Sequence, residues 1–295
     1  MSVIIDSRLD VPRARQVAAF VDRLGLAGVW LRQPWWPVDG PVMSTADTAG
    51  LLAELAADGR VRAGLIADAG KADVSWPDRL ATVAAAGQEG TAPAPGLRVA
   101  VAGAPGDVAR WQHLIRQHAA GAVRQLATPA RPARPAAGAG DTPPATVFVP
   151  CLPGRDLAAE ISAAARGGPV LAEVTVSVGR TTAEARARAE ADELFTVAGH
   201  PARQGLFGSL EECQAAASRL AHAGVTELVC CLPLVADLPD VLAQLRSIAV
   251  GAGILRPGDP ASAAPPAPAG WGGRRPARDD RAGLRRFHAG RRPAA

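Results

Sequence analysis

The stretch that decides the fold is residues 208–233, GSLEECQAAASRLAHAGVTELVCCLP. Ser209 and Glu212 have the spacing of a capping box, which predicts that a helix begins here. Gly224 ends this helix, and the apolar run TELVCCL at 226–232 predicts a strand directly after it. The apolar face of the helix carries Cys213, Ala216, Ala217 and Leu220. A capped helix that turns at once into a buried strand is typical of parallel α/β folds.

The same alternation of strand and helix runs along residues 1–255. Helix start and stop signals predict helices between the strands, including one over 107–126. Two architectures remain open, a doubly wound open sheet and a (β/α) barrel. The DSRLDVP sequence after the first strand lacks the glycine-rich dinucleotide motif, which disfavours the first of them. Apolar runs predict seven strands, at 2–6, 28–33, 61–67, 97–103, 146–152, 170–178 and 226–232.

Three stretches resemble the luciferase-like flavin-dependent monooxygenases. AAFVDRLGLAGVWLRQPWWP at 18–37 is similar to the first helix and second strand of that family. VTVSVGRTTAEARARAEADELF at 174–195 is similar to the strand and helix that precede the family's closing unit, and residues 208–233 resemble that unit itself. The three stretches follow the family's order. The resemblance implies an α/β fold, a TIM-type (β/α)8-like barrel.

The sequence departs from the family at two places. The family carries one more strand and helix before the strand at 170–178, whereas Gly167 and Gly168 here lead straight into Pro169. The family's fourth strand has the pattern GR-x-x-LG-x-G, whereas GLRVAVAGAPG stands at 96–106. We therefore expect a barrel that is shortened to about seven strands.

Composition divides the chain into a barrel domain and a tail. We expect residues 1–255 to form the luciferase-like barrel domain, with a flexible Pro/Ala-rich loop at 127–145, and residues 256–295 to be a disordered Pro/Ala/Arg-rich tail. The net charge of the whole chain is +4, and the nine Arg and three Asp of the tail contribute +6, which leaves −2 for residues 1–255. A nucleic-acid-binding face on the folded part is therefore not expected.

The cysteines and the N-terminus bear on metal binding and location. The four Cys residues form no Cys-x-x-Cys pair, and no His stands at ligand spacing beside them. Cys151, Cys230 and Cys231 lie in apolar strands, where a reduced thiol acts as a small hydrophobic group. The N-terminal sequence MSVIIDSRLD has no basic segment followed by a long apolar run. We expect a cytoplasmic protein with no metal and no membrane span.

In barrels of this type the active site lies at the carboxyl ends of the strands, and this rule selects candidate residues. Asp6 stands at the end of the first strand and Arg32 at the end of the second, and Trp35 and Trp36 come shortly afterwards. We predict that these four residues line a substrate pocket. The alternatives are that the two tryptophans cover the barrel rim or a dimer contact, and that Arg32 makes a surface salt bridge.

The same rule, with the resemblance, selects cofactor-binding residues. Gly154 in PGRD at 153–156 lets the backbone approach a ligand closely, and the helix that follows offers free N–H groups to an anion. Arg155 adds a forked donor suited to phosphate. In the family the equivalent loop holds the flavin phosphate; Asp156 is a helix cap that competes with an anion. The predicted cofactor-binding residues are Ala67, Asp68, Gly103, Pro153, Gly154 and Arg155.

The resemblance implies a flavin- or deazaflavin-dependent oxidoreductase that binds FMN or coenzyme F-420. Such an enzyme acts on a small organic substrate by hydride transfer or oxygen-dependent oxidation. The cofactor carries the redox chemistry, so no catalytic residue is assigned. The family also implies a homodimer or a flavin reductase partner. The departures described above support a second hypothesis, a degenerate barrel without cofactor that acts as a partner subunit or regulator. A doubly wound domain that binds a small molecule is the third.

Overall fold

The structure is a computed structural model. It describes residues 1–32, 42–70, 75–88, 97–119, 123–129, 145–151, 155–192, 195, 205–233 and 238–255. Four predicted site residues lie outside the described residues, namely Trp35, Trp36, Pro153 and Gly154. The tail at 256–295 and residues 130–144 of the predicted loop also lie outside them. The domain boundaries and the predictions made for these segments therefore stay predictions.

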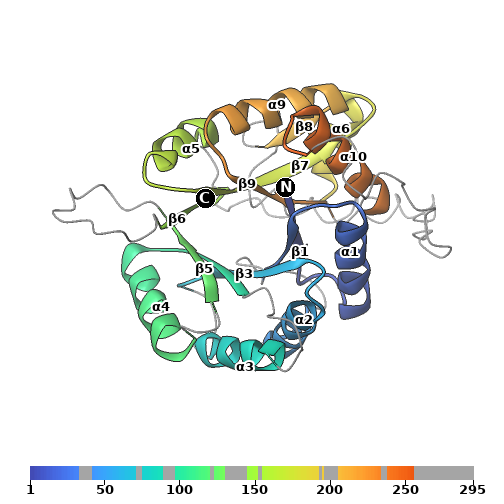
Figure 1. The fold of residues 1–295 in the computed structure, drawn as a ribbon. Helices are drawn as coiled ribbons and strands as arrows, with labels where there is room; N and C mark the ends of the chain where they lie inside the picture. The colour runs from blue at the N-terminus through green and yellow to red at the C-terminus, as the bar shows by residue number, and fades with distance from the viewer. Residues whose placement is uncertain are drawn as a thin grey trace, which may run out of the picture. The chain divides into compact units, whose positions relative to one another are not determined.

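Eight parallel strands close into a barrel, which confirms the TIM-type fold (Figure 1). Their order around the ring is β6-β5-β4-β3-β2-β1-β9-β7, and pairing of β6 with β7 closes it. A ninth strand, β8 (Leu206–Gly208), pairs only with the last three residues of β7 and lies outside the ring. The eight barrel strands are β1 (Ser2–Asp6), β2 (Gly28–Arg32), β3 (Arg62–Asp68), β4 (Leu97–Ala102), β5 (Val123–Thr128), β6 (Thr146–Val149), β7 (Val170–Val178) and β9 (Glu227–Cys231).

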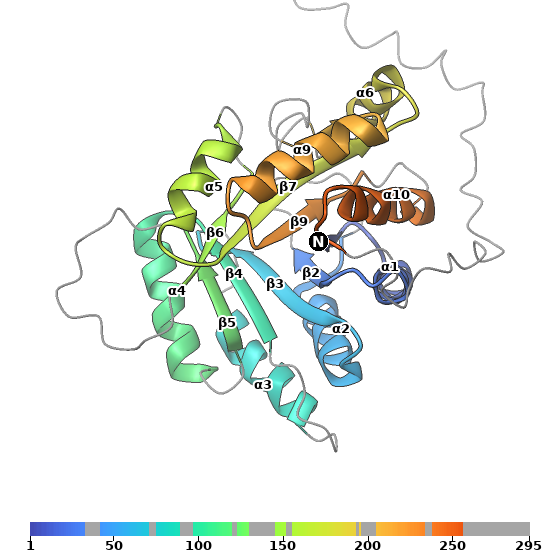
Figure 2. The same ribbon diagram turned by 45° about the horizontal axis from the view of Figure 1, so that its top comes forward.

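Helices surround the ring of strands, as Figures 1 and 2 show. The predicted capping box of Ser209 and Glu212 is present, and Ser44 with Asp47 forms a second one. Each supplies partners to backbone N–H groups that the first helical turn leaves without an acceptor. The described helices are α1 (Val11–Arg23), α2 (Thr45–Asp58), α3 (Trp76–Gln88), α4 (Pro105–His118), α5 (Leu157–Ala165), α6 (Thr182–Glu190), α9 (Leu210–His222) and α10 (Leu238–Gly251).

The expectation of seven strands is wrong, because β5 lies where the sequence pattern predicts the end of a helix. The helix predicted over 107–126 ends at His118, and residues 123–128 form a strand between β4 and β6. In this strand, VRQLAT, Ala127 is buried whereas Arg124 is exposed. A strand covered so lightly has no continuous apolar run, which was the signal used for the other strands.

The interior of the barrel is a packed core. Because side chains alternate along a strand, one face of each strand points inward and the other meets the helices. Trp30 fills the centre, and a Cβ on Gly64 would come within 2.5 Å of its ring. The inward-facing cluster of buried residues contains Ile4, Trp30, Ile66, Ala100, Ala127, Phe148, Leu171, Val229 and Cys231.

An ion pair lies among the amino-terminal ends of the strands. Nη1 of Arg98 donates to both carboxylate oxygens of Glu227, at 2.9 and 2.8 Å, and Ser2 donates to the same carboxylate. The Arg98 guanidinium also stacks over the Trp30 ring at 4.3 Å. These contacts close the end of the barrel opposite to the predicted site. Among the described residues, no helix is long and apolar enough to cross a membrane.

Candidate active site

The carboxyl ends of the strands gather polar side chains, as the barrel rule predicts. Asp6 and Arg32 end neighbouring strands at paired positions. By alternation they share the inward face with Ile4 and Trp30 of the interior cluster. Both are buried. Two of the four predicted substrate-pocket residues are therefore brought together at the barrel mouth, by which we mean the carboxyl-terminal end of its interior.

Arg32 forms a buried ion pair with Glu173 of β7. β1 and β9 lie between β2 and β7 in the sheet, so the pair reaches across the interior. Burial by itself lowers the pKa of Arg32, but the Glu173 carboxylate outweighs burial and raises that pKa above its usual value. Arg32 is thus a charged group held inside the barrel, and the surface salt bridge considered for it is wrong.

Two thiols adjoin this pair. Cys231 donates to Oε1 of Glu173 at 3.3 Å, and Nη1 of Arg32 lies 3.7 Å from its sulfur. Burial raises the pKa of Cys231 well above its usual value and that of Cys151 to about 12, and the Glu173 carboxylate adds to both shifts. A thiol acts as a nucleophile only after it loses its proton. These two thiols therefore stay neutral, as the prediction of structural thiols requires.

Arg8 connects the end of β1 to the segment after α6. Its Nε lies 3.2 Å from Oδ1 of Asp6, and its Nη1 lies 3.0 Å from Oδ1 of Asp192. The Asp192 side chain is almost fully buried. Ala189 of α6 and Phe195 join the interior cluster. Asp192 is therefore held at the barrel mouth by charge, and Ala189 and Phe195 are held there by packing.

The predicted cofactor-binding residues on β3 and after β4 differ in whether they lie at the barrel mouth. Ala67 is buried on the outer face of its strand, since its neighbour Ile66 belongs to the inward cluster. Asp68 follows on the inner face, and its Oδ1 accepts a hydrogen bond from the Gly70 N–H at 3.0 Å. Gly103 adopts a φ of 130°, and a Cβ there would lie 3.6 Å from Asp68 Oδ1. Asp68 and Gly103 thus adjoin at the mouth, whereas Ala67 does not face it.

Arg155 and Asp156 each have a partner within α5 or at its start. Nη1 of Arg155 lies 3.2 Å from Glu160 Oε1. The side chain of Asp156 caps α5 by accepting from the Ala159 N–H at 3.1 Å. A carboxylate therefore already occupies the helix start, where it takes the place that a phosphate needs.

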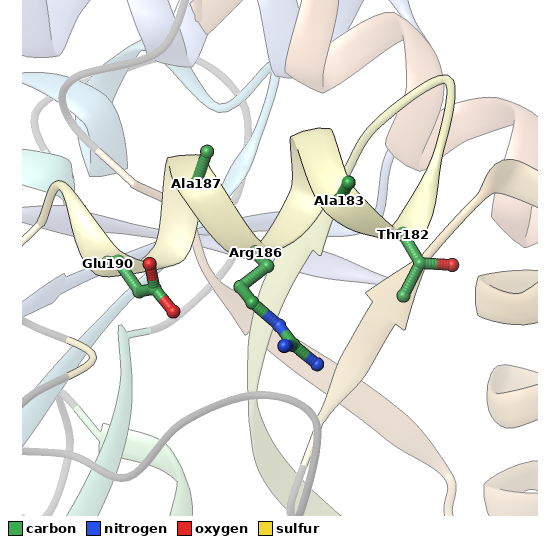
Figure 3. Close-up of a pocket in the computed structure, with 5 residues that line it drawn as sticks. All are labelled: Thr182, Ala183, Arg186, Ala187 and Glu190. Carbon is green, nitrogen blue, oxygen red and sulfur yellow. The ribbon is translucent and has the colours of Figure 1, made fainter.

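A pocket of about 370 Å³ lies along one side of α6 (Figure 3). Ala185 and Ala189, on the other side of this helix, are buried. The Arg186 side chain extends away from the helix in Figure 3. None of the lining residues belongs to the mouth described above, so we do not take this pocket as the candidate site. The lining residues are Thr182, Ala183, Arg186, Ala187 and Glu190.

Sequence reasoning missed Glu173, Arg8 and Asp192. A signal for Glu173 was present, because a lone carboxylate in the apolar run VLAEVTVSV needs a buried partner. Arg8 and Asp192 lie in connecting segments with no distinguishing pattern. Among the described residues, no group of three or more His, Cys, Asp or Glu side chains is placed to hold a metal ion.

Comparison with known proteins shows the fold. Neither a family model nor the sequence of a curated protein matches the chain. Apo-MsnO8 is 15% identical, with a TM-score of 0.52, over 86% of this chain and 98% of that one. The monooxygenase RslO1 from Streptomyces bottropensis is 11% identical, with a TM-score of 0.53, over 84% and 98% of the two chains. The riboflavin lyase RcaE, solved with modified FMN and riboflavin, is 11% identical, with a TM-score of 0.54, over 86% and 91%.

These three solved structures share the closed barrel over almost their whole length. The family that the stretches at 18–37, 174–195 and 208–233 resemble implies the same barrel fold. The chain therefore has the fold of the luciferase-like family.

Proposed function

We propose that the chain is a flavin- or deazaflavin-dependent oxidoreductase that acts on a small organic substrate by hydride transfer or oxygen-dependent oxidation. The observation that carries this proposal is the buried Arg32–Glu173 pair, which lies where barrel enzymes bind and transform their ligands. The fold supports the same class, since RslO1 is a monooxygenase and RcaE was solved with modified FMN and riboflavin.

The residues present fit the ring of such a cofactor at the barrel mouth. Oε2 of Glu173 is a buried acceptor without a hydrogen-bond partner among the described residues, and flavin and deazaflavin rings carry an N–H donor. Bound FMN or coenzyme F-420 would supply the redox chemistry. Within this chain, Arg32 holds the Glu173 carboxylate in place and neutralises it, and the neutral thiols of Cys151 and Cys231 add no competing nucleophile.

The test is a titration of the purified protein with FMN and with coenzyme F-420, followed by absorbance and fluorescence. We expect micromolar binding of one of them. Arg32→Gln should weaken that binding at least tenfold, because the Glu173 carboxylate then loses its partner and its position. Arg98→Gln is the matched control, since it removes a guanidinium of similar burial from the opposite end of the barrel. Loss of binding in both variants would count against a site at the mouth.

A second candidate is a barrel that binds no cofactor and acts as a partner subunit or regulator. The pairing of Arg155 with Glu160 and the Asp156 cap favour it, because each places a carboxylate beside the predicted phosphate site. Absence of binding for both cofactors in the titration would support this candidate.

The resemblance also leads us to propose a homodimer, or a flavin reductase that supplies reduced cofactor. Sedimentation equilibrium of the full chain distinguishes monomer from dimer. If the protein is active with chemically reduced FMN in the absence of a reductase, no dedicated reductase partner is required.

A further inference from the structure

The two oxygens of the Glu173 carboxylate differ in their hydrogen bonds to the protein. Its Oε1 accepts from both Arg32 and Cys231. Its Oε2 is buried and accepts from none of the described residues. The side chain as a whole is 1% exposed. A buried acceptor without a donor is uncommon in folded proteins and calls for an explanation, and a bound ligand or water is one that places a donor there.

The charges around Glu173 restrict what such a ligand can be. The described charged groups at the mouth are Asp6, Arg8, Arg32, Asp68, Glu173 and Asp192, which sum to −2. An anionic group such as a phosphate is therefore disfavoured there. Because Arg32 already balances the Glu173 carboxylate, a neutral donor satisfies Oε2 without adding an unpaired charge to a buried site.

We propose that Oε2 of Glu173 accepts the hydrogen bond of a neutral ring N–H group in the bound cofactor. This inference rests on the proposed function. The pyrimidinedione ring that FMN and deazaflavins share has one such group, N3–H, between two carbonyl groups. Glu173 thereby recognises the edge common to both cofactors and orients the ring at the strand ends, whatever the phosphate-bearing tail contacts.

Arg32 and Cys231 act on the ligand only through Glu173. Both donate to Oε1, and neither donates to Oε2. With Oε1 occupied, the carboxylate cannot rotate without breaking these bonds, so Oε2 stays directed at the ligand. Arg32 and Cys231 are therefore positioning residues for the acceptor.

The experiment compares lumiflavin, which carries N3–H, with 3-methyllumiflavin, in which a methyl group replaces that hydrogen. Affinities are measured by fluorescence titration of the full chain. We expect the wild type to prefer lumiflavin by about tenfold or more, since a hydrogen bond to a charged acceptor is among the stronger ones. In Glu173→Gln the amide N–H₂ group replaces Oε2 and opposes N3–H, so the preference should fall to about one.

The matched control is Glu227→Gln. It removes a buried carboxylate that is also paired with an arginine, but at the opposite end of the barrel. This variant should keep the wild-type preference. A steric effect of the methyl group would persist in Glu173→Gln, so persistence of the preference there overturns the proposal.

Two further outcomes separate failure of this inference from failure of the proposed function. Equal affinity of the wild type for the two ligands overturns the inference and leaves the proposed function standing, and this comparison needs no variant to fold. Absence of binding of lumiflavin, FMN and coenzyme F-420 overturns both. Circular dichroism of each variant shows whether a change in affinity comes from the site or from loss of the fold.

Discussion

Arg32 and Glu173 are 141 positions apart in the chain and meet inside the barrel as a buried ion pair. Each is the one charged residue of its strand, and each alone would leave a charge without a partner in the core. Their pairing depends on closure of the sheet, because β1 and β9 separate their strands. The pair is at once the main polar feature of the candidate site and a test of the fold.

Removal of one member of this pair should strongly destabilise the protein. We expect Arg32→Met to lower the free energy of unfolding by about 3–5 kcal/mol, because Glu173 would remain buried and unpaired. The double change Arg32→Met with Glu173→Leu should recover most of this loss. Urea unfolding followed by circular dichroism measures both. Arg15→Ala, which breaks the exposed pair with Glu54, should change the unfolding midpoint little. Equal losses at the two pairs would contradict the buried position of Arg32.

The centre of the barrel should tolerate no side chain at Gly64. A Cβ there meets the Trp30 ring at 2.5 Å, so Gly64→Ala should destabilise by about 1–3 kcal/mol through overpacking. Gly50 in α2 has no atom within 4 Å of the same position, so Gly50→Ala should stabilise by about 0.5–1 kcal/mol. Thermal unfolding measures whether each substitution raises or lowers the stability. A neutral Gly64→Ala would show that Trp30 can move, and partial rescue by Trp30→Phe would confirm the contact.

The stability of the protein should fall in acid through Glu227. Burial raises the pKa of this carboxyl, but Arg98 and Ser2 outweigh burial and leave the pKa below its ordinary value. A group with a lowered folded pKa stabilises the fold above its unfolded pKa, about 4.3, and loses that contribution as the pH falls through the folded pKa.

The urea midpoint should therefore decrease on acidification below about pH 4.3. Glu227→Gln should flatten this part of the profile, whereas Glu54→Gln, at an exposed position, should leave its slope unchanged. The same slope in the wild type and in Glu227→Gln would assign the acid sensitivity to other carboxyls.

The four thiols should be unreactive in the folded protein. All four are buried and free, and burial raises the pKa of Cys151, Cys213 and Cys230 to about 12. At pH 8 we expect negligible reaction with Ellman's reagent, and four equivalents after unfolding in guanidinium chloride. Rapid modification of one thiol in the native state would show that its strand opens locally.

Several features could be predicted because their signals are local. The capping box of Ser209 and Glu212 spans four residues, and the apolar runs that form the strands are contiguous. Asp6 and Arg32 could be placed at strand ends by counting along each run. β5 could not be predicted in this way, because VRQLAT is only partly buried and has no continuous run of apolar residues. At the start of α5 the sequence predicts the Asp156 cap but not the pairing of Arg155 with Glu160, which depends on side-chain conformation.

The sequence by itself determined the alternation of helices and strands, and with it the parallel sheet, since backbone hydrogen bonding and apolar periodicity act over a few residues. Only the tertiary structure decided which charges meet. Glu173 pairs with Arg32, and Arg8 joins Asp6 to Asp192, across stretches of chain that become neighbours when the eight strands close. A buried charge needs a partner of opposite charge, and closure of the barrel determines which residue that partner is.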